Sequence, residues 1–250
     1  MNFFYVVNGK AIKQGLLIII ASFFTAWFLY MENIIHVPVF SANDGPKAIY
    51  KGEKDAALTF NIGWGDEKAE PILDVLKKQN VKAATFFLSG SWAERHPELV
   101  ARIMKEGYEI GMLGYDYKDY TDLEESKIRQ DLAKGQEAFK KLNVKDIKLV
   151  RAPTGHFDQK TLNVAEKMGY TVVHWSIDSK DWTNPGVERI AENAAKAGKG
   201  DIILLHASDS AKQTAKALPA IIGKYKDKGL KLVSVSEMMA NASTKSNEIK

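Results

Sequence analysis

Four polar residues that could serve acid–base chemistry, two aspartates, one histidine and one arginine that could orient them, lie at or after the ends of short apolar stretches of the chain. Asp178 and Asp181 come just after one stretch, Arg151 closes another, and His206 ends a third. A histidine beside a carboxylate is the usual arrangement for general acid–base catalysis, because the carboxylate orients the ring and stabilises its protonated form. Taken singly, His206 also fits a structural histidine, Arg151 a surface ion pair and either aspartate a turn or cap. Together they predict a functional site, if the fold brings them to one place.

Short apolar runs alternate with amphipathic stretches from about residue 51 onward, which predicts alternating strands and helices. The expected strands are Ala56–Phe60, Ala84–Leu88, Glu109–Met112, Leu149–Arg151, Tyr170–Ile177, Ile202–His206 and Lys231–Ser234. Helices between successive strands imply parallel pairing, because a parallel pair needs a long crossover connection. An open doubly wound sheet and a (β/α) barrel both satisfy this pattern, and both build their sites at the C-terminal ends of the strands. The four polar residues are therefore expected at one end of the sheet.

Capping residues mark several of the expected helix starts. Thr121 and Glu124 have the spacing of a capping box before a long helix, and Ser234 and Glu237 repeat this spacing before a short one. Asp158 is expected to cap another helix through its side-chain carboxylate. Each of these caps predicts one hydrogen bond to a free backbone N–H.

The N-terminal part carries the uncharged stretch GLLIIIASFFTAWFLYM over residues 15–31. Its length is at the short end of the roughly 17–25 residues that a transmembrane helix needs. Lys10 and Lys13 precede it, which favours a cytoplasmic N-terminus and places the rest of the chain outside the cytoplasm. A cleaved signal peptide is the alternative, although Phe40 is too large for the small-x-small pattern before Ala42.

Composition is that of a globular domain with a core of its own. Of the 250 residues 45% are hydrophobic and 26% are charged, and the net charge is +4. Mixed charges without a basic stripe give no indication of nucleic-acid binding, and the lack of cysteine excludes disulfides and thiolate metal sites. The expected parts are a cytoplasmic N-terminus (1–14), a transmembrane signal-anchor (15–31), a linker (32–50), a folded domain (51–240) and a polar tail (241–250).

Five segments resemble, in order and spacing, the motifs of the polysaccharide deacetylase (NodB-homology) family over about residues 56 to 240. Thr59–Gly63 is similar to T-F-D-D-G, Leu113–Tyr117 falls where H-[ST]-x-x-H is expected, Arg151–Gly155 is similar to R-x-P-[YF]-G, Asp178–Trp182 to D-x-x-D-W, and Leu204–His206 to L-x-H. The PdaB-like sporulation subgroup, which is anchored to the membrane, is the most similar branch. The resemblance implies an α/β fold, a distorted (β/α)7 barrel of NodB type that follows one transmembrane helix.

Members of this family hydrolyse N-acetyl groups of amino sugars, with a divalent metal held by one aspartate and two histidines. By this resemblance Asn61 occupies the position of the catalytic base, where an amide cannot accept a proton at neutral pH. The three metal-ligand positions are Ile62, Leu113 and Tyr117, and these side chains cannot replace a carboxylate and two imidazoles. We therefore expect no bound metal and no other cofactor.

The second half of the family's site is present in this chain. The candidate catalytic residues, carried over from the family, are Asn61, Arg151, Asp178, Asp181 and His206. Trp64, Tyr117, Thr154 and Trp182 are the candidate substrate-binding residues, Thr154 replacing an aromatic residue of the family. The expected ligand is an acetylamino-sugar polymer, with peptidoglycan as the first candidate.

Three functions remain open at this point. The first is a deacetylase with an altered site, in which Asp66, Asp116, Asp119 or His156 supplies the missing base or ligand. The second is a glycan-binding protein on the outer face of the membrane that lacks catalytic activity. The third is a metal-free hydrolase that uses His206, although no G-x-S-x-G nucleophile motif is present.

Overall fold

The chain divides into two compact units, Met1–Gly45 and Pro46–Lys250. The structure, a computed structural model, describes residues 13, 20, 22–25, 45–240 and 245–247. The predicted membrane helix over residues 15–31 lies for the most part outside the described residues. Among those that are described, no helix is both long and apolar enough to cross a bilayer.

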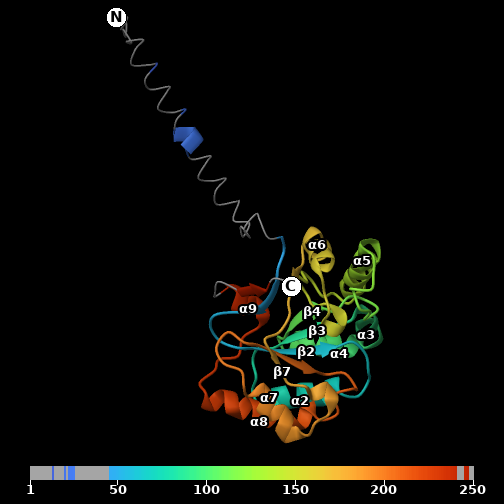
Figure 1. The fold of residues 1–250 in the computed structure, drawn as a ribbon, viewed down its shortest axis with the longest axis vertical. Coiled ribbons are helices and arrows are strands. Elements are labelled where there is room, and N and C mark those ends of the chain that lie inside the picture. The colour runs from blue at the N-terminus through green and yellow to red at the C-terminus, as the bar shows by residue number, and fades with distance from the viewer. Residues whose placement is uncertain (1–12, 14–19, 21, 26–44, 241–244, 248–250) are drawn as a thin grey trace, which may run out of the picture. The chain divides into compact units, whose positions relative to one another are not determined.

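A curled sheet of seven parallel strands forms the centre of the second unit (Figure 1). Its strands are β2 (Ala57–Ile62), β3 (Thr85–Leu88), β4 (Glu109–Met112), β5 (Leu149–Val150), β6 (Thr171–Val172), β7 (Ile177–Asp178) and β8 (Ile202–His206). Their order across the sheet is β6-β5-β4-β3-β2-β8-β7, and every neighbouring pair is parallel. The predicted α/β architecture is therefore present as a curled half-barrel, in which β3 is the middle strand and the two-residue strands β6 and β7 form the edges.

The expected strand Tyr170–Ile177 is wrong as a single element. It forms β6 and β7, which lie at opposite edges of the sheet. Between them, His174 N–H donates to the carbonyl of Ile49 and Ser176 N–H donates to the carbonyl of Ile202. These bonds to different parts of the chain bend the run and carry it from one edge of the sheet to the other, which curls the sheet.

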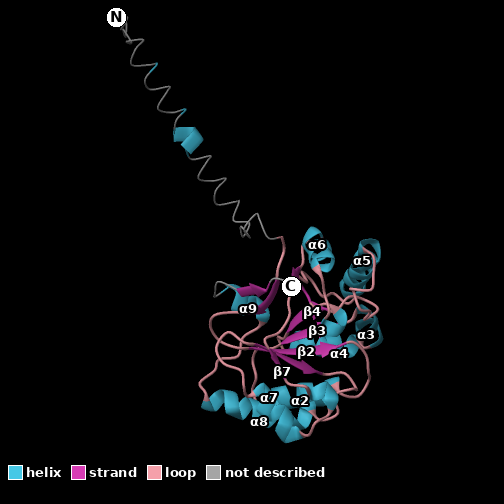
Figure 2. Ribbon diagram, in the orientation of Figure 1, coloured by secondary structure: helices cyan, strands magenta, loops and turns pink. Residues whose placement is uncertain are grey.

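The last expected strand, Lys231–Ser234, is also wrong, because only Leu232 makes a bridge, to Ala56. A separate two-stranded antiparallel sheet joins β1 (Ala48–Lys51) to β9 (Lys245–Asn247). Helices cover the outside of the half-barrel (Figure 2). They are α2 (Ala69–Lys78), α3 (Gly90–Arg95), α4 (Pro97–Lys105), α5 (Glu125–Lys141), α6 (Gln159–Lys167), α7 (Val187–Ala194), α8 (Thr214–Asp227) and α9 (Val235–Ala240).

Two of the expected caps are confirmed. Asp158 Oδ1 accepts the N–H of Thr161 at 2.8 Å at the start of α6, and Ser234 Oγ accepts the N–H of Glu237 at 3.1 Å at the start of α9. Each bond satisfies a backbone donor that the first turn of a helix leaves unpaired.

The third expected cap is wrong, because α5 begins at Glu125 and Glu124 makes no side-chain cap. Thr121 instead donates its backbone N–H and its hydroxyl to Asp119, which holds a turn before the helix. A threonine followed three residues later by a glutamate also occurs in this turn, so the capping-box pattern alone did not place the helix start. Ser89, which the sequence analysis missed, accepts the N–H of Trp92 and caps α3.

Alternation along β2 separates two environments, because successive strand residues face opposite sides of a sheet. Phe60 and Ile62 are fully buried in the main core, which lies between the sheet and the helices. Thr59 and Asn61 face the interior of the half-barrel, where Arg151 reaches both. Strand β2 therefore presents Thr59 and Asn61 to the site, and Phe60 and Ile62 to the core.

Candidate active site

Asp181 and His206 form a buried pair at the carboxyl ends of the strands. The carboxylate of Asp181 is fully buried, and its Oδ1 lies 2.7 Å from Nδ1 of His206. Its Oδ2 accepts the backbone N–H of His206 at 2.7 Å and the hydroxyl of Thr214 at 2.7 Å. Because a carboxylate only accepts, Nδ1 carries the hydrogen and Nε2 is left to face the site. This is the geometry of an oriented acid–base histidine.

Thr214 is a member of this network that the sequence analysis missed. It lies at the start of α8, eight residues beyond His206, and its hydroxyl is fully buried. No motif marked it, since its role depends on where the helix packs.

Asp178, the other candidate partner, does not reach His206. Its carboxylate accepts the N–H of Lys180 at 2.7 Å and forms an ion pair with the Lys180 ammonium at 2.9 Å. Lys180 has a left-handed backbone, with φ of 59°. This turn directs the carboxylates of Asp178 and Asp181 to different partners.

Asn61 lies beside His206, because β2 and β8 pair with these two residues in register. Behind them Arg151 is fully buried. Its guanidinium donates to four oxygens: Thr59 Oγ1 (2.9 Å), Asn61 Oδ1 (2.9 Å), Val173 O (3.2 Å) and His174 O (3.0 Å). In the described part of the chain no carboxylate lies within ion-pair distance of it, and burial lowers the pKa of Arg151 to about 9. The charge is thus solvated by neutral oxygens and by the face of Phe87, 4.1 Å away.

A pocket of about 320 Å³ opens onto these groups. It is lined by Asn61, Trp64, Tyr117, Thr154, Trp175, Asp178, Trp182, Leu204, His206, Ser208 and Ser210. Trp64 and Trp182 are about half exposed, at 49% and 48%, although tryptophan is usually well buried. All four residues expected to bind substrate line this pocket, and exposed indole faces suit the apolar faces of sugar rings.

The loop that carries Trp64 is fixed by Asp209. Its carboxylate accepts the backbone N–H groups of Asp66, Glu67 and Lys68 at 3.0, 3.0 and 3.2 Å. Burial alone would raise the pKa of Asp209, but these three bonds outweigh it and lower the pKa. Asp209 thereby ties the loop after β2 to the loop after β8.

The side chains at the family's metal-ligand positions do not fit a metal. Ile62 packs in the core between sheet and helices, whereas Leu113 packs in a second cluster inside the half-barrel. Tyr117 lies against Gly63 so closely that a Cβ on this glycine would approach its ring to 2.6 Å, and burial raises the pKa of its phenol. The described residues contain no group of three or more His, Cys, Asp or Glu side chains placed to hold an ion.

The residues considered as substitutes are engaged elsewhere. Asp66 pairs with His96 at 2.9 Å, and Asp116 with Lys118 at 3.0 Å. Asp119 accepts from His156 at 2.6 Å and from the hydroxyl of Thr154 at 3.0 Å.

Burial alone would raise the pKa of Asp119, yet hydrogen bonds from His156, Thr121 and Thr154 outweigh it and lower the pKa to about 2. A carboxylate this acidic is a poor proton acceptor, so Asp119 does not replace the missing base.

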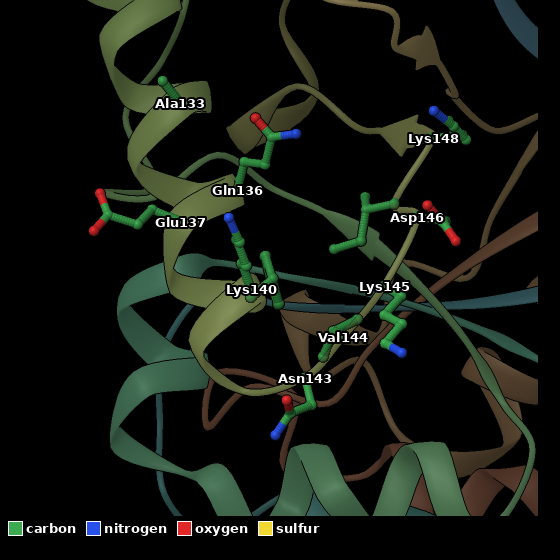
Figure 3. Close-up of a pocket in the computed structure, with 11 residues that line it drawn as sticks. Ala133, Gln136, Glu137, Lys140, Asn143, Val144, Lys145, Asp146 and Lys148 are labelled. Atoms are coloured by element: carbon green, nitrogen blue, oxygen red, sulfur yellow. The ribbon is translucent and has the colours of Figure 1, made fainter.

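A larger hollow, of about 740 Å³, lies between α5 and residues 143–148 (Figure 3). It carries lysines such as Lys140, Lys145 and Lys148 but no histidine. Residues 143–148 precede β5, so this hollow lies toward the amino ends of the strands, away from the Asp181–His206 pair. The volume of a pocket therefore does not identify the site. The smaller pocket is the candidate active site because His206 and Asn61 line it.

The fold and the pocket define a parallel α/β half-barrel with its polar site at the carboxyl ends of the strands. The family model for polysaccharide deacetylases matches residues 48–173. The chain belongs to the polysaccharide deacetylase family.

Relatives and solved structures agree with this assignment. A peptidoglycan-N-acetylglucosamine deacetylase of Bacillus cereus is 36% identical over 191 residues, which cover 75% of this chain and 89% of that protein. The uncharacterized protein YlxY of Bacillus subtilis is 34% identical, and the match spans 61% of its length. A CE4 family pseudoenzyme from Bacillus anthracis has a similar crystal structure, with a TM-score of 0.72 and 28% identity over 78% of this chain and 69% of that one.

Proposed function

We propose that this chain recognises an acetylamino-sugar polymer, with peptidoglycan as the first candidate, and does not carry out the family's metal-dependent deacetylation. One observation carries the proposal. The pocket keeps the Asp181–His206 pair and two exposed indoles, while hydrocarbon side chains occupy two of the three metal-ligand positions. A site that lacks the metal ligands and the catalytic base of the family but has a binding surface is suited to recognition.

The relatives support the choice of ligand and of pseudoenzyme. Several are peptidoglycan deacetylases by name. The pseudoenzyme of Bacillus anthracis also exists as a mutant with restored enzymatic activity. We further propose, from the sequence of residues 15–31, that the chain is anchored in the membrane with its domain outside the cytoplasm. From the resemblance to the PdaB-like subgroup, we propose that it acts in sporulation.

Residual deacetylation is the second candidate, because His206 remains oriented to protonate a leaving amine. Bound metal and acetate release from peptidoglycan and chitin oligomers distinguish the two. We expect neither from the native chain. Acetate release that a chelator abolishes would refute the proposal.

A restored variant provides the positive control. Ile62→Asp, Leu113→His and Tyr117→His restore the family's residue types at the three ligand positions, and Asn61→Asp restores the base. The matched control adds His206→Ala to these four changes, so that metal binding remains and proton donation is lost. Acetate release by the four-residue variant alone would indicate that the pocket still accepts the family's substrate.

A further inference from the structure

Arg151 fixes the orientation of the Asn61 amide. A guanidinium has only donors, so the atom that faces it at 2.9 Å is the carbonyl oxygen Oδ1. The Nδ2 group of Asn61 is therefore turned away from Arg151, and among the described residues no acceptor bonds to it. Since Asn61 lines the pocket, its two N–H donors are available to a ligand there.

His206 supplies a second polar group to the same pocket, and this group is a donor when the ring is protonated. It lies directly beside Asn61 in the β2–β8 register and also lines the pocket. Its Nδ1 is held by Asp181, and within the described chain Nε2 has no partner. When the ring is protonated, Nε2–H is a charge-assisted donor to a ligand in the same pocket.

The charges around this pair favour an anion. The carboxylate of Asp181 balances a protonated His206, whereas Arg151 stands behind Asn61 without a carboxylate partner and leaves one positive charge uncompensated. The negative charge of Asp178 on the pocket wall is already compensated by Lys180, 2.9 Å away. Where the family's motif has the carboxylate of its catalytic base, this chain has the amide donors of Asn61, with the guanidinium of Arg151 behind them.

We propose that the floor of the pocket binds the carboxylate of an acidic sugar, such as the free lactyl carboxylate of N-acetylmuramic acid in a glycan strand that carries no stem peptide. One carboxylate oxygen accepts from Asn61 Nδ2 and the other from His206 Nε2, and the sugar rings lie against Trp64 and Trp182. This inference rests on the proposed glycan recognition and names the ligand class within it.

Two tetrasaccharides of equal length test the inference by calorimetry with the full chain. One is a chitin tetramer of N-acetylglucosamine, which is neutral, and the other alternates N-acetylglucosamine with N-acetylmuramic acid. A charge-assisted contact predicts that the acidic tetramer binds roughly tenfold more tightly. In Asn61→Asp a carboxylate replaces the donor, so the affinity for the acidic tetramer should fall to that for the chitin tetramer or below it.

Lys148→Gln, in the larger hollow of Figure 3, is the matched control and should leave the preference unchanged. Equal affinity of the native chain for both tetramers would overturn the carboxylate site and leave glycan recognition standing. Loss of the preference in Lys148→Gln, or its survival in Asn61→Asp, would also overturn the site. Binding of neither tetramer would instead contradict the proposed function itself.

Discussion

Replacing Asn61 with aspartate should stabilise the fold. Arg151 is fully buried and its nearest oxygens are neutral, so its charge is incompletely compensated. Removing one partner of a buried ion pair costs about 3–5 kcal/mol. Arg151 in the native chain resembles a buried cation whose carboxylate has been removed, except that the Asn61 amide still accepts one hydrogen bond from it. Because a bond between two charged groups is roughly twice as strong as a neutral one, we expect Asn61→Asp to add about 2 kcal/mol at neutral pH.

The gain should depend on pH in a direction that follows from linkage. The pKa of the new carboxylate is lowered by the guanidinium in the folded state, relative to about 3.9 in the unfolded chain. The extra stability is therefore fully present above about pH 5 and is lost as the pH falls through the lower folded-state pKa. For a unit of this size, about 2 kcal/mol corresponds to a rise of roughly 4–8 °C in Tm.

Urea denaturation at pH 7 and pH 3 measures both parts of this prediction. Asn61→Leu removes the acceptor at similar volume and should destabilise, since a donor of Arg151 loses its partner. In an Arg151→Gln background, Asn61→Asp should bring no gain. A destabilised Asn61→Asp at pH 7, or a gain that persists in the Arg151→Gln background, would refute the view that Arg151 lacks compensation.

Three further variants test the supporting contacts. Asp181→Ala removes the acceptor of three buried hydrogen bonds and should lower the free energy of unfolding by about 3 kcal/mol in urea titration. The matched Asp178→Ala should cost less than about 1 kcal/mol, and equal losses would contradict the assignment of Asp181 as the partner of His206. Asp158→Ala should cost about 1 kcal/mol through loss of the α6 cap, and an unchanged urea midpoint would argue against that cap. Asp209→Ala should speed amide hydrogen exchange in the loop after Trp64 and weaken glycan binding, whereas unchanged exchange would show that the loop is held otherwise.

Much of the site could be predicted from local sequence. Parallel strands end at the same edge of a sheet, so the residues that follow them meet without further information. This rule placed Arg151 and His206, the family resemblance added Asn61, and the structure brings the three together. The chemical consequences of Ile62 and Leu113 also follow from residue type, because a hydrocarbon cannot ligate a metal in any fold.

Tertiary structure decided what depends on partners distant in the sequence. The run Tyr170–Ile177 has the apolar composition of one strand, but bonds to β1 and to the start of β8 divide it between two sheet edges. Thr214 joins the site only because α8 packs beside it.

The choice between Asp178 and Asp181, three positions apart, shows both what the sequence determines and what only the tertiary structure decides. The sequence by itself determined that an aspartate would stand near His206, since both candidates follow the strand next to β8. Only the folded chain decided which one, because the left-handed turn at Lys180 directs Asp181 inward, where buried donors hold it, and leaves Asp178 paired with a lysine. Residue type and order fix which chemical groups reach the site, whereas backbone direction, which depends on long-range hydrogen bonds, fixes the contacts that each of them makes.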